Sequence, residues 1–210
     1  MKIKSVEFAG AIAQPGGKPP AGDLRQVAFA GRSNVGKSSL INTLLGRTRS
    51  RVARVSSTPG KTREINFYRV RVGLSDGAET DFFLVDLPGY GYARVPLAVR
   101  ERWKPLIEGY LRQSEALVGV VQLIDARHGP TRDDLRMVEY LAATGVPTLF
   151  VLTKIDKLSR SQRAVQIRRI TETLGVESDQ VLPFSSHTGE GREALLESLE
   201  QLLRETGGRA

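Results

Sequence analysis

Apolar and polar residues alternate along this chain in a pattern that predicts short buried strands separated by helices. Apolar runs of strand length, each bounded by turn residues, predict six strands: Gln26–Ala30, Asn66–Val72, Asp81–Val85, Gly119–Ile124, Thr148–Leu152 and Val181–Phe184. Apolar residues that recur every three or four positions predict five helices: Lys37–Leu45, residues 99–111, Arg132–Ala143, Ser159–Leu174 and Arg192–Arg204. This alternation predicts an α/β fold with a mostly parallel sheet and helices on both of its faces.

Two further features refine this architecture. The strands at 66–72 and 81–85 are joined by a turn that contains Gly77, so we expect them to form a hairpin. One strand of the sheet would then be antiparallel to the others. Residues 9–22 are rich in Gly, Pro and Ala and predict an irregular segment. We therefore expect an N-terminal lead-in at 1–24 and a single domain at 25–206, with ligands bound at the carboxyl ends of the strands.

The first predicted strand runs into a Gly-rich turn and then a helix. Residues Gly31 to Ser38 in this turn fit the pattern G-x-x-x-x-G-K-[ST]. Such a turn points backbone N–H groups at phosphate oxygens, while Lys37 adds a positive charge and the Ser38 hydroxyl is a ligand for Mg²⁺. The pattern predicts a nucleoside triphosphate bound by nine residues: Gly31, Arg32, Ser33, Asn34, Val35, Gly36, Lys37, Ser38 and Ser39.

The tetrapeptide Asp86-Leu87-Pro88-Gly89 ends the second strand of the predicted hairpin. An acid at this position can hold a water of the Mg²⁺ shell, because Mg²⁺ keeps several of its waters in proteins. The N–H of Gly89 can contact the terminal phosphate. A D-x-x-G tetrapeptide is often a plain turn, but its place one hairpin after the phosphate loop predicts that Asp86, Leu87, Pro88 and Gly89 belong to the same site.

Two motifs that follow later strands predict the base. In Thr153-Lys154-Ile155-Asp156, the carboxylate can accept two parallel hydrogen bonds from the ring N–H and exocyclic amine of guanine, a donor pair that adenine lacks. Lys154 can lay its aliphatic stem along the base. Phe184-Ser185-Ser186 can offer backbone N–H groups to the guanine carbonyl. The sequence therefore predicts GTP or GDP as the ligand.

Composition and charge narrow the partners. The chain has no cysteine, which excludes disulfides and thiolate metal ligands, and no apolar run reaches the roughly 20 residues that cross a bilayer. No export signal is recognisable at the start, so we expect a cytoplasmic protein. Of the net charge of +8, the segment Arg47–Arg71 contributes eight bases against one acid, Glu64. Such a segment favours a polyanionic partner, either RNA or an anionic membrane surface.

The ordered motifs resemble those of translation-factor-class GTPases. Three longer strings, GRSNVGKSSLIN, STPGKT and DLPGYGYA, are similar to the EngB family of bacterial ribosome-biogenesis GTP-binding proteins, and the resemblance covers nearly the whole chain. It implies a Ras-like P-loop GTPase fold, Mg²⁺ as cofactor and slow hydrolysis of GTP. It also implies a monomeric switch in assembly of the large ribosomal subunit, on which cell division and septation depend indirectly. Ribosomal RNA or a ribosomal subunit would dock on Arg47–Arg71.

The resemblance also implies which threonine contacts the metal. Thr62 in STPGKT would ligate Mg²⁺ together with Ser38, with Gly60 and Lys61 beside the nucleotide. From the residues alone, Thr58 fits this role equally well.

Catalysis is expected to depend on positioning and charge, which Lys37 and Thr62 would supply. Tyr90 stands where Ras-like proteins have a water-orienting Gln, so no dedicated base is identified. Related GTPases suggest K⁺ beside Asn34 as an additional cation.

Some alternatives remain open on the sequence. One alternative is a GTP-dependent RNA- or membrane-binding module with vestigial hydrolysis. Another is a kinase that uses the same phosphate loop, although a kinase is expected to lack the T-K-x-D motif that this chain has. The segment from Gly89 to Tyr92 either changes shape between nucleotide states or packs its tyrosines on a neighbouring helix.

Overall fold

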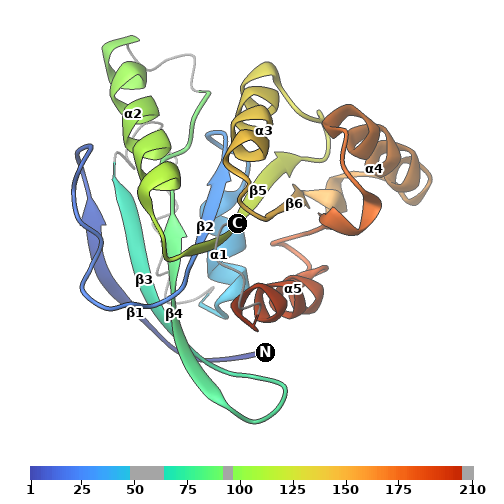
Figure 1. The fold of residues 1–210 in the computed structure, drawn as a ribbon. Helices are drawn as coiled ribbons and strands as arrows, with labels where there is room; N and C mark the ends of the chain where they lie inside the picture. Colours follow the sequence, from blue (N-terminus) through green and yellow to red (C-terminus); the bar gives the residue numbers. More distant parts are fainter. Residues whose placement is uncertain (48–63, 92–96, 205–210) are drawn as a thin grey trace.

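The computed structural model describes residues 1–47, 64–91 and 97–204, and only the backbone of residues 97–104. Seven strands form one sheet in the order β1-β3-β4-β2-β5-β6-β7 (Figure 1). Their bounds are β1 (Lys2–Ile12), β2 (Gln26–Gly31), β3 (Ile65–Gly73), β4 (Glu79–Asp86), β5 (Leu117–Asp125), β6 (Thr148–Thr153) and β7 (Val181–Pro183). Only β3 runs against its neighbours, β1 and β4. The predicted α/β class with one antiparallel strand is confirmed.

The sheet contains one strand more than the six that the apolar pattern predicts. The additional strand, β1, pairs antiparallel with β3 from Lys2↔Gly73 to Ile12↔Ile65. It lies at the edge of the sheet, and its charged side chains, such as Lys4 and Glu7, are exposed. An edge strand with little burial has no continuous apolar run, which explains why the pattern does not reveal it. Residues 9–12, which their composition predicts to be irregular, belong to this strand, so that part of the prediction is wrong; the domain boundary at residue 24 stays a prediction.

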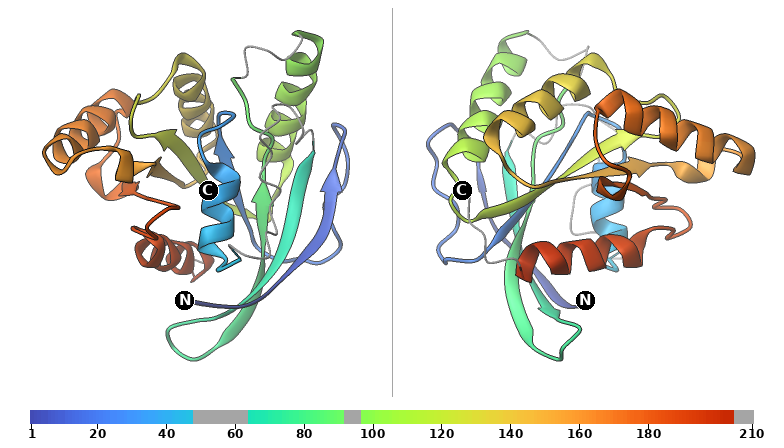
Figure 2. Two further views of the ribbon diagram at one scale, coloured as in Figure 1. Left: turned by 180° about the vertical axis from the view of Figure 1, so that it is seen from behind. Right: turned by 45° about the vertical axis from the view of Figure 1, so that its right-hand side comes forward.

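Five helices cover the sheet in two groups (Figures 1 and 2). Their bounds are α1 (Lys37–Leu44), α2 (Leu97–Gln113), α3 (Arg132–Thr144), α4 (Arg160–Leu174) and α5 (Arg192–Arg204). Helices α1 and α5 pack on one face through leucines such as Leu40 and Leu199, and α2, α3 and α4 pack on the other. None of the helices in the described part of the chain is both long and apolar enough to span a membrane.

The loops at the carboxyl ends of the parallel strands gather at one edge of the sheet. The loop after β2 leads into α1, and the loop after β6 contains the short 3₁₀ helix η1 (Ile155–Lys157). A second 3₁₀ helix, η2 (Ser178–Gln180), precedes β7. This arrangement brings the four predicted motifs, which are distant in sequence, to the same edge.

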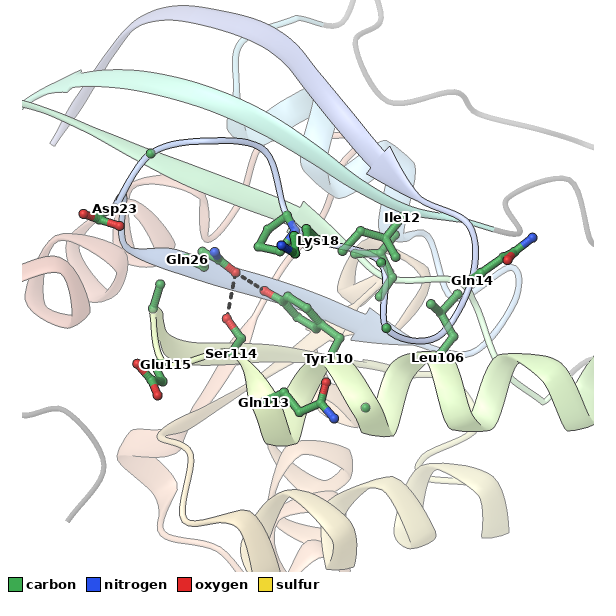
Figure 3. Close-up of a pocket in the computed structure, with 17 residues that line it drawn as sticks. Ile12, Gln14, Lys18, Asp23, Gln26, Leu106, Tyr110, Gln113, Ser114 and Glu115 are labelled. Carbon is green, nitrogen blue, oxygen red and sulfur yellow. Dashed lines mark hydrogen bonds between the residues drawn. The ribbon is translucent and has the colours of Figure 1, made fainter.

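A cavity of about 400 Å³ lies at the opposite end of β2, between residues 12–23 and the last turns of α2 (Figure 3). Tyr110 of α2 and Ser114, the residue after its last one, both donate hydrogen bonds to the side-chain oxygen of Gln26, at 2.7 and 3.0 Å. Gln26 is the first residue of β2, whereas the phosphate loop follows the last one. The cavity is therefore separate from the predicted nucleotide site.

Candidate functional site

The phosphate loop has the backbone geometry that its glycines predict. Gly36, directly before α1, has a φ of 106°, which a residue with a Cβ adopts only with strain. Gly31 ends β2, and a Cβ there would lie 2.9 Å from a methyl group of Val35 and 3.1 Å from the Cβ of Leu123. The turn therefore needs glycine at both positions of the motif, and it leads directly into the amino end of α1.

Lys37 and Asp86 are brought into direct contact, as the predicted convergence of the two motifs requires. The Lys37 Nζ pairs with a carboxylate oxygen of Asp86, and both side chains are more than 90% buried. Asp86 is aligned with Phe29 of β2 in the parallel β2–β4 pair. Two buried opposite charges thus face each other at the carboxyl ends of adjacent strands, next to the phosphate loop.

Gly89 lies against the phosphate loop. A Cβ at Gly89 would lie 3.2 Å from the N, Cα and Oγ of Ser33, so the two backbones are in close contact. The Ser33 N–H donates to the Tyr90 carbonyl at 2.8 Å, and Arg32 and Tyr90 form an isolated parallel bridge. The segment after Asp86 is thus tied to the loop that would hold the phosphates.

The Tyr90 side chain is directed toward α3. Its hydroxyl donates to Asp134 at 2.8 Å and accepts from the Gln122 amide at 2.5 Å. Burial and then the charge of Asp134 raise the pKa of Tyr90 well above its usual value, so the hydroxyl stays protonated. Asp134 also caps α3 through reciprocal hydrogen bonds with Thr131. In this structure Tyr90 therefore packs on a neighbouring helix, whereas Tyr92 lies outside the described residues. A change of shape between nucleotide states stays a prediction.

The T-K-x-D motif follows β6 and contacts the phosphate loop. The Thr153 hydroxyl donates to the Val35 carbonyl at 2.6 Å, which ties β6 to the turn before α1. Asp156 lies in η1, where the Ser185 hydroxyl donates to it at 2.7 Å. Burial would raise the pKa of Asp156, but the hydrogen bonds from Ser185 and Lys157 outweigh it and lower the pKa. Asp156 is therefore an ionised acceptor held in place by Ser185.

The backbone N–H groups of Phe184-Ser185-Ser186 were expected to face the guanine carbonyl, and two of the three have partners within the fold. The Phe184 N–H donates to Leu152, at 2.8 Å, and the Ser185 N–H donates to Glu190, at 3.0 Å. These two N–H groups hold the end of β7 against β6 and hold the loop that follows β7, so they are not available to a base. Ser186 is left as the N–H of this motif that could reach the guanine carbonyl, while Ser185 contributes its hydroxyl to Asp156.

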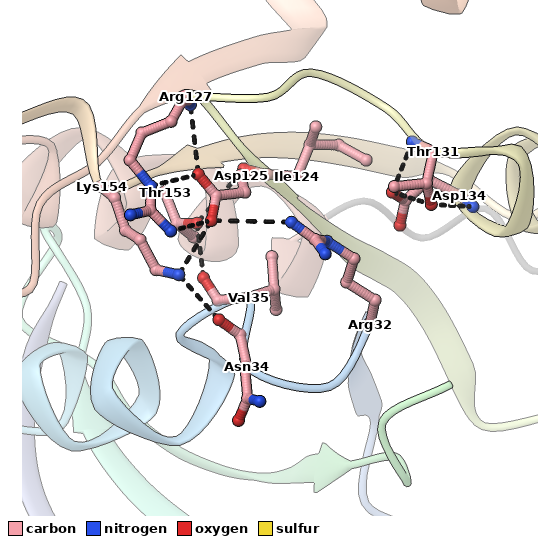
Figure 4. Close-up of polar contacts among 10 residues, drawn as sticks. All are labelled: Arg32, Asn34, Val35, Ile124, Asp125, Arg127, Thr131, Asp134, Thr153 and Lys154. Atoms are coloured by element: carbon pink, nitrogen blue, oxygen red, sulfur yellow. Dashed lines mark hydrogen bonds and ion pairs between the residues drawn. The ribbon is translucent and has the colours of Figure 1, made fainter. Parts of the chain in front are cut away.

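Asp125, which belongs to none of the four predicted motifs, lies at the centre of an ion-pair network (Figure 4). It is 1% exposed and ends β5. Arg127 donates to both of its oxygens, at 3.0 and 2.8 Å, Lys154 donates at 2.8 Å, and Arg32 lies 3.7 Å away. Burial alone would raise the pKa of Asp125, but the hydrogen bonds from Arg127 and Lys154 hold it below its usual range. Its position at the end of a central parallel strand was the available signal.

Part of the basic segment is neutralised. Arg69 and Arg71 on β3 both pair with Asp81 on the neighbouring strand, at 2.5 and 2.9 Å. Asp81 lies outside the segment in sequence, so a count within Arg47–Arg71 misses it. Residues 48–63 lie outside the described part of the chain, and with them Thr58, Gly60, Lys61 and Thr62.

Two oxygen-bearing side chains near the phosphate loop are of the type that bind Mg²⁺. The Ser38 hydroxyl lies in the first turn of α1, and the Asp86 carboxylate ends β4. Both are hard oxygen ligands, which Mg²⁺ prefers. Among the described residues, no three acidic or His side chains gather as a metal cluster. A cation held by few protein ligands and by substrate phosphates fits this set.

Comparison with known proteins identifies the family. Residues 26–154 match the family model described as 50S ribosome-binding GTPase, and residues 106–205 match the elongation factor Tu GTP binding domain.

Several relatives bear the name "Probable GTP-binding protein EngB". The one from Gemmatimonas aurantiaca is 50% identical over 97% of this chain and 95% of its own. The one from Desulforamulus reducens is 48% identical over 99% and 97%. A crystal structure with the same protein name has a TM-score of 0.65 and 26% identity, over 85% of this chain and 98% of that chain. The chain therefore belongs to the EngB family of GTP-binding proteins, which are P-loop GTPases.

Proposed function

We propose that this protein is a GTP-driven switch that binds a ribosomal particle during assembly of the large subunit, in the cytoplasm and as a monomer. The observation that carries the switch is the contact between Gly89 and the phosphate loop at Ser33. A terminal phosphate bound by the loop would meet the Gly89 backbone, and the loss of that phosphate on hydrolysis would remove the contact between phosphate and Gly89. Effects on cell division and septation would follow indirectly from ribosome supply.

The proposed chemistry uses positioning and charge. When bound, Mg²⁺ would neutralise phosphate charge, held by Ser38 and by Thr62, with Asp86 on its water shell. Lys37 would bind the outer phosphates. In the structure Lys37 and Asp86 neutralise each other, so the pocket carries no uncompensated buried charge from this pair. With ligand bound, the phosphates would take the place of Asp86 as the partner of Lys37, and the hydrated cation would take the place of Lys37 as the partner of Asp86.

Slow intrinsic hydrolysis is supported by the contacts of Tyr90. Its hydroxyl donates a hydrogen bond to Asp134, and the hydroxyl oxygen accepts a hydrogen bond from the Gln122 amide. Because both functions of the hydroxyl are used, Tyr90 does not orient a water as the Gln of Ras-like proteins does. Single-turnover phosphate release with and without ribosomal particles tests this. Slow release that the particles accelerate is expected, and release absent in both would favour the binding module with vestigial hydrolysis.

We also propose K⁺ beside Asn34 as an activating cation. Asn34 is exposed on the phosphate loop, with a positive φ of 64°. Its side-chain oxygen is the type of ligand that K⁺ takes in place of water. Turnover is compared in potassium and sodium buffers of equal ionic strength, with Asn34→Ala as control. Equal rates in the two buffers would end this proposal.

The ribosomal partner is supported by the family description and by the charge of residues 47–63. Since Arg69 and Arg71 both pair with Asp81, which offsets one of their two charges, the RNA contacts are assigned to the bases before them. Binding should fall steeply with salt and differ between the GTP and GDP states.

Co-sedimentation with ribosomal subunits, in each nucleotide state and across a salt series, tests this partner. Charge reversal at Arg49, Arg51 and Arg54 should abolish binding. Replacement of Arg69 and Arg71 by Gln is the matched control and should leave it almost unchanged. Equal loss in both sets, or binding that ignores the nucleotide, would contradict the proposal. Flotation with anionic vesicles tests the membrane alternative.

A further inference from the structure

Two residues of the site share an unusual backbone conformation. Asn34 and Lys154 are the non-glycine residues with positive φ in the described part of the chain, at 64° and 61°. Left-handed backbone at residues with a Cβ is unfavourable and persists only where the surroundings hold it. The two residues are 120 positions apart in sequence, yet the Lys154 Nζ donates to the Asn34 carbonyl at 2.7 Å. The strained phosphate loop and the strained T-K-x-D motif are thus joined directly.

Asp125 is the group that holds this junction. Its carboxylate accepts from the same Lys154 Nζ at 2.8 Å, and Arg32 of the phosphate loop lies 3.7 Å from the same oxygen (Figure 4). A lysine side chain has a long flexible stem and a strongly hydrated head. Without Asp125, the Lys154 head would have only the Asn34 carbonyl to hold it and would turn toward solvent.

We propose that Asp125 is a positioning residue for nucleotide binding, which acts through Lys154 and couples the base-selecting motif to the phosphate loop. The inference rests on the proposed role of Lys154 against the base. Asp125 itself touches neither base nor phosphate in this account. It fixes the Lys154 head, so that the aliphatic stem lies where the base plane would contact it, and it keeps Asn34 in the conformation that the loop needs.

The competing interpretation is that Asp125 only stabilises its own loop. Arg127 donates to both Asp125 oxygens, and the Arg127 backbone N–H donates as well, at 3.1 Å. These contacts lie within the loop after β5 and do not include the site. Arg127→Gln removes the side-chain contacts and leaves Lys154 paired, so it is the matched control.

A double-mutant cycle on GDP affinity separates the two interpretations. The dissociation constant is measured for the wild type, Asp125→Asn, Lys154→Gln and the double variant. A charged hydrogen bond of this kind leads us to expect a loss of about 10-fold or more in each single variant. The double variant should bind GDP no more weakly than the single variant with the lower affinity. Arg127→Gln should lose less than about threefold in GDP affinity.

Three results would overturn the inference. Losses that multiply in the double variant would show that Asp125 does not act through Lys154. A loss in Arg127→Gln equal to that in Asp125→Asn would assign Asp125 to its loop. Unchanged GDP binding in Lys154→Gln would remove the proposed role of Lys154 as well, whereas the base choice is tested separately at Asp156. If Asp125→Asn does not fold, Asp125→Glu keeps the charge while displacing the carboxylate, and the same cycle applies to it.

Discussion

Tyr90→Phe removes a hydroxyl that joins the segment after Asp86 to α3. Asp134 would lose the partner of one oxygen while keeping Thr131 at the other, at 2.8 and 2.7 Å. Gln122, whose side-chain oxygen already has no partner among the described residues, would lose a partner for its amide nitrogen too. Asp134 and Gln122 are both 0% exposed. A buried hydrogen bond to a charged group contributes about 1.5–3 kcal/mol, so we expect a loss of about 2 kcal/mol in the free energy of unfolding.

Tyr110→Phe is the matched control, because it removes the same hydroxyl from another buried tyrosine. Its partner is the neutral side chain of Gln26, whose oxygen would still accept from Ser114 at 3.0 Å (Figure 3). We expect about 0.5–1 kcal/mol here. In a chain of this size 1 kcal/mol corresponds to about 2–4 °C in Tm.

Urea denaturation at pH 7, followed by circular dichroism, measures both variants against the wild type. The expected order is wild type, then Tyr110→Phe, then Tyr90→Phe. A Tyr90→Phe protein as stable as the Tyr110→Phe protein would show that the hydroxyl contributes no charge-assisted bond, and would refute the assignment of Tyr90 as a link between the phosphate loop and α3.

Three further predictions concern the site. Gly89→Ala places a Cβ 3.2 Å from Ser33, so we expect about 1–3 kcal/mol of strain and a smaller difference between GTP and GDP affinity, measured by calorimetry; unchanged discrimination would contradict it. Ser185→Ala removes the 2.7 Å hydrogen bond to Asp156 and should weaken GDP binding about 3–30-fold while raising the pKa of Asp156; wild-type affinity would count against Ser185. The pKa of Asp125 is lowered, so its stabilising contribution is complete above about pH 4 and is lost as the pH falls through the folded pKa; the stability gap between wild type and Asp125→Asn should therefore close in acid, and a gap that widens in acid would be inconsistent with this sign.

The sequence predicts the parts of the fold in which local pattern and tertiary role agree. Buried parallel strands read as apolar runs, so β2, β5 and β6 were recognisable, and the glycines of the phosphate loop were required by the backbone itself. Strand β1 was not recognisable, because an exposed edge strand is specified by its pairing with β3 rather than by its own residues.

The site could be predicted only as far as its motifs are contiguous. Asp125 belongs to no motif, and its importance comes from Lys154 and Arg32, which reach it from two other loops. The N–H groups of Phe184 and Ser185 were expected to face a base, but hydrogen bonding within the fold uses them. Such contacts depend on the relative placement of distant segments, which a single sequence pattern does not contain.

We expect the phosphate loop and Asp156 to bind the same guanine nucleotide. Asp156→Asn tests it, because xanthine has a carbonyl where guanine has its exocyclic amine, so the carboxamide should select it. Binding of GDP and XDP to wild type and variant is measured by calorimetry. We expect a loss of GDP affinity of about 10-fold or more in the variant, together with a gain in affinity for XDP. GDP binding equal to that of the wild type would contradict it.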